Sequence, residues 1–300
     1  MSRRLKTLLW GLALEALVLP ALAAQEPPTW APATLPEARQ HDLQAQSGKA
    51  YRIFIAAPNQ APPPAGHPVL YVLDGNAAFP VAAFLARSAA GRSEITGLTP
   101  PIVVGIGYPN SKDFDGPARR RDYTVASGGP EDGVSEGGAE DFLDFIETEL
   151  KPLIAARHPV NPERQALFGH SFGGLLVVHA LLTRPDSFST FLASSPSLWW
   201  KEQRVLEKLP LLLESNARPR VQISVGALED DPPKGNYPPE MRAMIAQRQM
   251  IPPARQLAAQ LRQAPGWENR LAYYELAGED HGLVWLPALS RGVQFFLEQP

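Results

Sequence analysis

Short apolar runs alternate with segments of helical periodicity along this chain. The short runs are bounded by glycine, proline and asparagine, a pattern that predicts strands. They cover residues 49–56, 69–73, 102–106, 165–168, 191–194, 221–225 and 271–276. Segments with helical periodicity follow at residues 77–87, 139–156, 172–182 and 286–298. Strands that alternate with helices predict an α/β fold, with a mostly parallel central sheet and helices on both faces.

Residues 112–138 interrupt this alternation with a long polar stretch that carries the arginine run Arg119, Arg120 and Arg121. A loop of this length in a compact domain is usually functional or disordered. Pockets in open parallel sheets lie where strands end, so we expect this loop to select anionic substrates. The alternative is that the arginines form solvated ion pairs with nearby aspartates.

The N-terminus has the pattern of a secretory signal peptide. Basic residues near the start precede an apolar stretch at residues 8–22, and the alanines at 21 and 23 suit a small-residue cleavage site. We expect residues 1–24 to be removed, leaving residues 25–300 as one domain in the periplasm, without stable membrane insertion. The alternative is an uncleaved N-terminal anchor.

Composition excludes several kinds of chemistry. The chain has no cysteine, so disulfides and thiol nucleophiles are absent. Its 28 Lys and Arg residues against 31 Asp and Glu residues give a formal net charge of −3. This balance provides no global attraction to nucleic acid. No metal-ligand motif is present, so we expect neither a metal site nor a cofactor.

The segment Gly169-His170-Ser171-Phe172-Gly173 reads G-x-S-x-G and lies between a predicted strand and a predicted helix. This context is typical of the nucleophile elbow of α/β-hydrolases. A serine hydroxyl needs a base to take its proton before it can attack a carbonyl. The pattern therefore predicts Ser171 as a nucleophile, with His170 as the variable elbow residue that points away from the site.

A base and an acid are expected after the serine, since the chain order in this fold is serine, acid, histidine. Of six histidines, His281 follows the last predicted strand on a glycine-flanked loop, where the base belongs. The acid should follow the strand at residues 221–225. Glu229 is the first choice and Asp230 the alternative, and a Ser–His dyad without an acid remains open.

The oxyanion of the reaction should be stabilised by two backbone N–H groups. One belongs to Phe172, the residue after the serine. The second should come from the loop that follows the strand at residues 69–73, where Asn76 is the first choice and Gly75 the next.

Several segments together resemble the esterase-D-like branch of the α/β-hydrolases, which includes mycolyl transferases and enterobactin esterases. They read LYVLDGNAAF, GHSFGGLL, ASSPSLWW, VGALE and GEDHGLVW and span nearly the whole mature chain. The arginine run and the segment at residues 195–200 most resemble the periplasmic enterobactin esterases. The family motif ends D-Y-T-P, whereas Val125 replaces the proline here.

This resemblance implies a serine esterase that cuts the trilactone of a catecholate siderophore such as enterobactin, with iron present only in the bound substrate. Arginine forks suit anionic oxygens and aromatic walls suit catechol rings. Arg119, Arg120, Arg121, Trp199 and Trp200 are thus candidate substrate-binding residues, with one tryptophan expected in the core. The alternatives are a general carboxylesterase, an acyl transferase, or a non-catalytic siderophore-binding protein.

Overall fold

The computed structural model describes residues 30–110, 112–126, 133, 135–231 and 236–298. The chain divides into two units, residues 1–34 and Leu35–Pro300, and the second unit carries the fold. The expected signal peptide at residues 1–24 lies outside the described residues. No helix in the described part of the chain is long and apolar enough to cross a membrane.

An eight-stranded sheet forms the centre of the second unit, in the order β1-β2-β4-β3-β5-β6-β7-β8. The first two strands are antiparallel to their neighbours, and the other pairs are parallel. The strands are β1 (Ala38–Gln44), β2 (Ala50–Ala56), β3 (His67–Leu73), β4 (Ile102–Gly107), β5 (Val160–His170), β6 (Thr190–Ser194), β7 (Arg220–Gly226) and β8 (Leu271–Leu276). This topology is that of the α/β-hydrolase fold, which confirms the predicted fold class.

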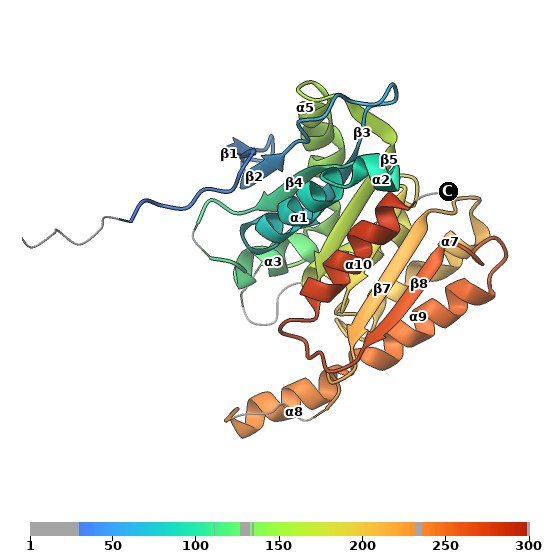
Figure 1. Cartoon of the computed structure of the whole chain (residues 1–300). Coiled ribbons are helices and arrows are strands. Elements are labelled where there is room, and N and C mark those ends of the chain that lie inside the picture. Colours follow the sequence, from blue (N-terminus) through green and yellow to red (C-terminus); the bar gives the residue numbers. More distant parts are fainter. Residues whose placement is uncertain (1–29, 111, 127–132, 134, 232–235, 299–300) are drawn as a thin grey trace, which may run out of the picture. The chain divides into compact units, whose positions relative to one another are not determined.

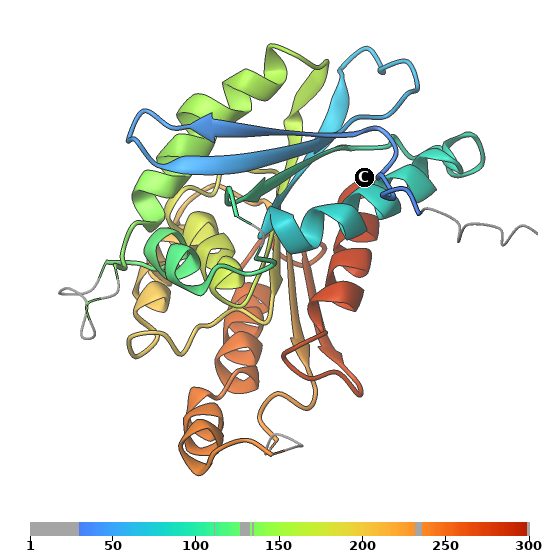
Figure 2. The same cartoon turned by 90° about the vertical axis from the view of Figure 1, so that its left-hand side faces the viewer.

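Helices cover both faces of this sheet (Figures 1 and 2). Helices α1 (Gly75–Ala90) and α10 (Trp285–Leu297) bury their apolar residues on one face. The other face is covered by α4 (Ala139–Phe145), α5 (Lys151–Ala155), α6 (Phe172–Thr183), α7 (Leu209–Glu214) and α9 (Ile251–Gln263). A π-helical turn (Ile146–Leu150) joins α4 to α5, so the helix predicted at residues 139–156 is nearly continuous.

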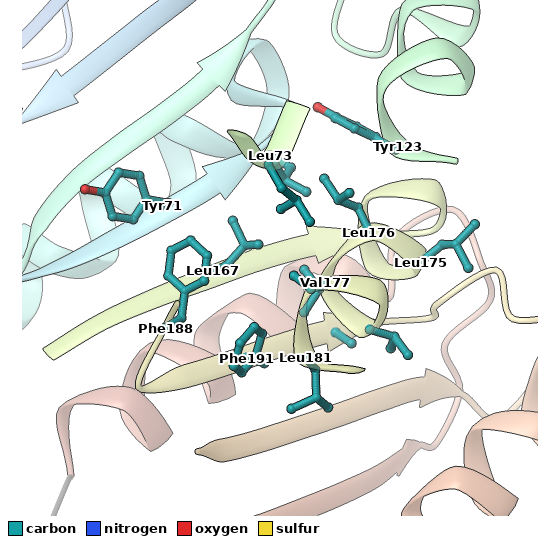
Figure 3. Close-up of a cluster of buried hydrophobic side chains, with 14 of the residues drawn as sticks. Tyr71, Leu73, Tyr123, Leu167, Leu175, Leu176, Val177, Leu181, Phe188 and Phe191 are labelled. Atoms are coloured by element: carbon teal, nitrogen blue, oxygen red, sulfur yellow. The ribbon is translucent and has the colours of Figure 1, made fainter. Parts of the chain in front are cut away.

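The core on the second face is densest around α6. Its side chains Leu175, Leu176, Val177 and Leu181 pack onto residues of the central strands, as Figure 3 shows. Strands β3, β4 and β6 are buried along their whole length. Burial on both faces explains why these strands read as continuous apolar runs in the sequence. The rigid core holds the carboxyl ends of the strands, and therefore the segments that follow them, in place.

Several elements differ from the prediction. The expected loop at residues 112–138 contains helix α3 (Gly116–Tyr123), which begins where the Asp115 carboxylate accepts the N–H of Ala118. Strand β1 was not predicted because it lies at the sheet edge and is mostly polar and exposed. Shorter helical segments at Ser93–Thr96 (α2) and Arg204–Lys208 (a 3₁₀ turn), together with α7, α8 (Pro239–Arg248) and α9, were also not predicted. Helix α8 projects from one end of the unit in both views (Figures 1 and 2).

Candidate active site

Ser171 lies in a sharp turn between β5 and α6. Its backbone has φ +60° and ψ −116°, a conformation that costs energy for a residue with a side chain. A Cβ atom at Gly169 would lie 2.4 Å from the backbone of Gly173, so the elbow has room only for glycine there. The turn is held by hydrogen bonds of Ser171 N–H to Ser194 O and of Ser197 N–H to Ser171 O.

The hydroxyl of Ser171 lies at one end of a chain of hydrogen bonds. Its Oγ is 3.1 Å from His281 Nε2, and His281 Nδ1 is 2.7 Å from Glu229 Oε2. The histidine follows β8 and the glutamate follows β7, while the serine follows β5. Parallel strands bring these three segments to the same edge of the sheet. The chain of contacts has the geometry of a nucleophile, a base and an orienting acid.

Glu229 is held rigidly in this arrangement. Its side chain is completely buried, and its Oε1 accepts hydrogen bonds from Ser195 Oγ and from the N–H of Gly226. The alternative acid, Asp230, has another task. Its carboxylate accepts the N–H groups of Met250 and Ile251 at the start of α9. Asp230 therefore caps a helix and does not contact His281.

His170 contradicts the expectation that it points away from the site. Its ring packs against the His281 ring, with 4.8 Å between the centroids, and its Nδ1 is 3.2 Å from Ser194 Oγ. Burial, together with the neighbouring His281 and Arg119, holds the pKa of His170 well below its usual value. A neutral His170 does not repel the positive charge that His281 acquires when it takes a proton.

The expected oxyanion-hole residues lie at two helix starts. Phe172 is the first residue of α6, and Gly75 and Asn76 are the first two residues of α1. N–H groups in a first helical turn have no acceptor within their own helix. Strands β3 and β5 are adjacent, so the two helix starts lie side by side, and their dipoles favour negative charge there. The Asn76 side chain is engaged elsewhere: its amide bonds the backbone of Tyr108 and Asn110.

A cavity of about 340 Å³ opens at Ser171. Trp199 lines it, whereas Trp200 belongs to the hydrophobic core. Ser197 and Arg248 are among the lining residues that were not predicted. Ser197 lies with its Oγ 3.3 Å from Ser171 Oγ, and Arg248 comes from the end of α8. The apolar periodicity of α9 could have revealed that the chain between β7 and β8 is helical, but nothing in the sequence distinguishes Arg248 from other arginines.

The arginine run does not line this cavity. Arg119, Arg120 and Arg121 lie on α3 and form ion pairs with protein carboxylates. Arg119 Nε is 2.8 Å from the buried Asp74, and the other two arginines pair with Glu136 and Asp122. Each guanidinium is thus engaged by a carboxylate of the protein, and a role of these arginines in substrate binding stays a prediction.

Within the described residues, no group of three or more His, Asp or Glu side chains is arranged to hold a metal ion. A strained serine, a histidine and a buried carboxylate on this sheet define a serine ester hydrolase of the α/β-hydrolase fold. A family model described as "Putative esterase" matches residues 45–296. The chain belongs to this family.

Similar proteins agree with this assignment. Ferri-bacillibactin esterase BesA of Bacillus subtilis is 36% identical over 261 residues, which cover 83% of this chain and 85% of that protein. The siderophore triacetylfusarinine C esterase of Aspergillus fumigatus is 36% identical over 284 residues, covering 89% of this chain and 95% of that protein. The solved structure of the BES protein from Bacillus cereus has a TM-score of 0.78 and 33% identity, covering 91% and 99% of the two chains.

Proposed function

We propose that this protein hydrolyses ester bonds of a siderophore, and that a catecholate trilactone such as enterobactin, with or without iron, is a substrate. The main support for ester hydrolysis is the chain of hydrogen bonds from Ser171 through His281 to Glu229. Relatives named as siderophore esterases support the substrate class. Iron enters only as part of the substrate.

The reaction begins with Ser171. Its Oγ attacks the ester carbonyl while His281 Nε2 takes the hydroxyl proton, and Glu229 stabilises the imidazolium through Nδ1. The N–H groups of Phe172 and Asn76 donate hydrogen bonds to the negatively charged oxygen of the tetrahedral intermediate. His281 then gives its proton to the leaving alcohol, and an acyl-enzyme forms. Water activated by His281 releases the acid and restores the serine.

We also propose that the enzyme acts in the periplasm after removal of residues 1–24. The basic start, the apolar stretch and the small-residue site support this location. N-terminal sequencing of the exported protein should begin near Ala24 or Gln25. Recovery of the whole chain in the membrane fraction would contradict cleavage.

Mass spectrometry of the products from an ester panel tests the function. The panel contains enterobactin, its ferric complex, a ferric hydroxamate ester and p-nitrophenyl butyrate. Hydrolysis of only the simple ester would favour a general carboxylesterase, and transfer of the acyl group to an added alcohol would favour an acyl transferase. Tight retention of a siderophore without any product would favour a binding protein.

Ser171→Ala tests the nucleophile and should lower kcat by several orders of magnitude without unfolding the protein. Ser197→Ala is the matched control, because its hydroxyl lies beside that of Ser171. A fluorophosphonate probe should label the native protein and the Ser197→Ala variant at Ser171. Labelling of Ser197, or normal turnover by Ser171→Ala, would contradict the proposed nucleophile.

A further inference from the structure

Arg248 is the one arginine in the described lining of the active-site cavity, which contains no lysine. It is the last residue of α8, the helix that projects from the end of the unit (Figures 1 and 2). Ser171, His281 and Trp199 line the same cavity. A charge in this position faces the same cavity as the proposed nucleophile.

The guanidinium of Arg248 has unusual surroundings. Its Cζ lies 4.8 Å from the centroid of the Trp199 ring, and its Nη2 is 3.2 Å from Met244 Sδ, a weak acceptor. Its Nε is buried without a hydrogen-bond partner. Among the described residues it forms no ion pair with a carboxylate, and burial alone lowers its pKa. The Nε1–H of Trp199 is likewise buried without an acceptor.

This arrangement is costly in the free protein. A partly buried guanidinium gives up hydration, and the stacked tryptophan offsets only part of that loss. A carboxylate normally provides the remainder, as it does for the arginines of α3. An oxygen of a ligand in the cavity would complete the hydrogen bonds of Arg248.

Three acidic side chains also line the cavity, and none of them pairs with Arg248. Glu229 is engaged by His281, Ser195 and Gly226. Asp280 accepts the N–H of Gly282, and Asp231 is exposed. The positive charge of Arg248 is therefore available to a ligand, while the acids limit how much negative charge the whole cavity tolerates.

We propose that Arg248 determines substrate specificity by binding an anionic oxygen of the substrate, with Trp199 holding the guanidinium in place. The chemical class of this ligand group is the chelating oxygen of a siderophore arm, either a catecholate or a hydroxamate oxygen. The identity of the arm rests on the proposed function, whereas anion binding by Arg248 does not. The planar fork suits such oxygens better than the point charge of lysine.

Steady-state kinetics of three variants test this proposal. Arg248→Gln should raise KM for ferric enterobactin about tenfold, because a charge-assisted hydrogen bond contributes at least that much binding. Its effect on KM for the neutral ester p-nitrophenyl butyrate should be several-fold smaller, and kcat should change less than KM. Arg248→Lys should lie between the wild type and Arg248→Gln for the ferric substrate.

Arg262→Gln is the matched control, since it removes the same charge from an exposed position on the next helix, α9, whose Arg262 does not line the cavity. It should leave KM for both substrates near the wild-type value. Equal losses on both substrates with Arg248→Gln, or no loss on either, would overturn the role of Arg248. A ferric tris-hydroxamate ester, which carries less negative charge than the catecholate complex, shows which kind of oxygen Arg248 prefers.

A second experiment distinguishes a failure of the proposed function from a failure of anion binding by Arg248. If the wild type does not cut a siderophore ester, 2,3-dihydroxybenzoate replaces the substrate as an inhibitor of p-nitrophenyl butyrate hydrolysis. Arg248→Gln should then raise the inhibition constant of this anion about tenfold. An unchanged constant would overturn anion binding by Arg248 independently of the natural substrate.

Discussion

Two regions near the active site contain arginines, and the two regions use them in opposite ways. On α3, three successive arginines are bound to carboxylates of the protein, including the buried Asp74. At the end of α8, the guanidinium of Arg248 lies over the Trp199 ring and donates to a methionine sulfur, and it forms no ion pair among the described residues. The arginines of α3 are thus paired within the protein, whereas Arg248 has no carboxylate partner among the described residues.

The two regions differ in how much hydration each guanidinium lost on folding and in which groups replaced that hydration. A buried ion pair restores the lost hydration within the protein, and breaking it leaves one charge without a partner. An unpaired arginine in a cavity keeps its electrostatic field available to whatever enters. A high density of charge along a sequence therefore does not identify a binding site. The partners of each charged group show whether it is already bound within the protein.

The largest effect should be on kcat and should come from a change of Glu229, the buried carboxylate that bonds His281. Glu229→Gln should lower kcat about a thousandfold or more, because an amide can donate to His281 Nδ1 and so hold the wrong tautomer. Asp230→Asn is the control, since that carboxylate caps α9. Its kcat should stay near the wild-type value. Losses below about tenfold in Glu229→Gln would instead favour a Ser–His dyad.

A smaller effect, on the free energy of unfolding, should follow when the ion pair between Arg119 of α3 and Asp74 is broken. Arg119→Gln leaves the buried Asp74 carboxylate without its cation, which should lower the free energy of unfolding by about 3 kcal/mol. Burial raises the pKa of Asp74, and without Arg119 this rise should increase. Denaturant unfolding followed by circular dichroism measures the loss.

Arg255→Gln is the control for this experiment, because it breaks an ion pair with Glu275 that is exposed to water. It should change the free energy of unfolding far less than Arg119→Gln. A stable Arg119→Gln protein with a raised KM only for ferric enterobactin would reverse the comparison. It would assign the α3 arginine, and not Arg248, to substrate binding.

The smallest effect should be a change in the pH dependence of stability. The folded protein lowers the pKa of His170 below 6.5. As the pH falls below 6.5, His170 therefore binds a proton in the unfolded chain before it does so in the folded chain. The stability contributed by neutral His170 is present above pH 6.5 and is lost as the pH falls below that value. This group alone changes the free energy of unfolding by at most about 1.4 kcal/mol per pH unit.

Unfolding of the wild type and of His170→Asn at pH 7 and pH 5.5 measures this contribution. The variant should lose about 1 kcal/mol less than the wild type between these two pH values. Equal losses in both proteins would show that His170 takes its proton as readily when folded as when unfolded.

Much of the fold could be predicted because its signals are local. The central strands are buried on both faces and so appear as apolar runs, and the helices on either side show a periodic apolar stripe. Edge strand β1 and helix α8 lacked such signals because they bury little. The segment at residues 112–138 was interpreted as a loop because α3 is short and mostly polar.

The sequence by itself determined the elbow around Ser171 and the chain order of serine, acid and histidine, because both follow from the local backbone and the alternation of strands and helices. Only the tertiary structure decided which carboxylate reaches His281, that His170 packs against it, and that Arg248 in the cavity has no carboxylate partner among the described residues. These outcomes depend on distances between residues far apart in the chain. A charge acquires its role from the groups that folding places within a few ångströms of it.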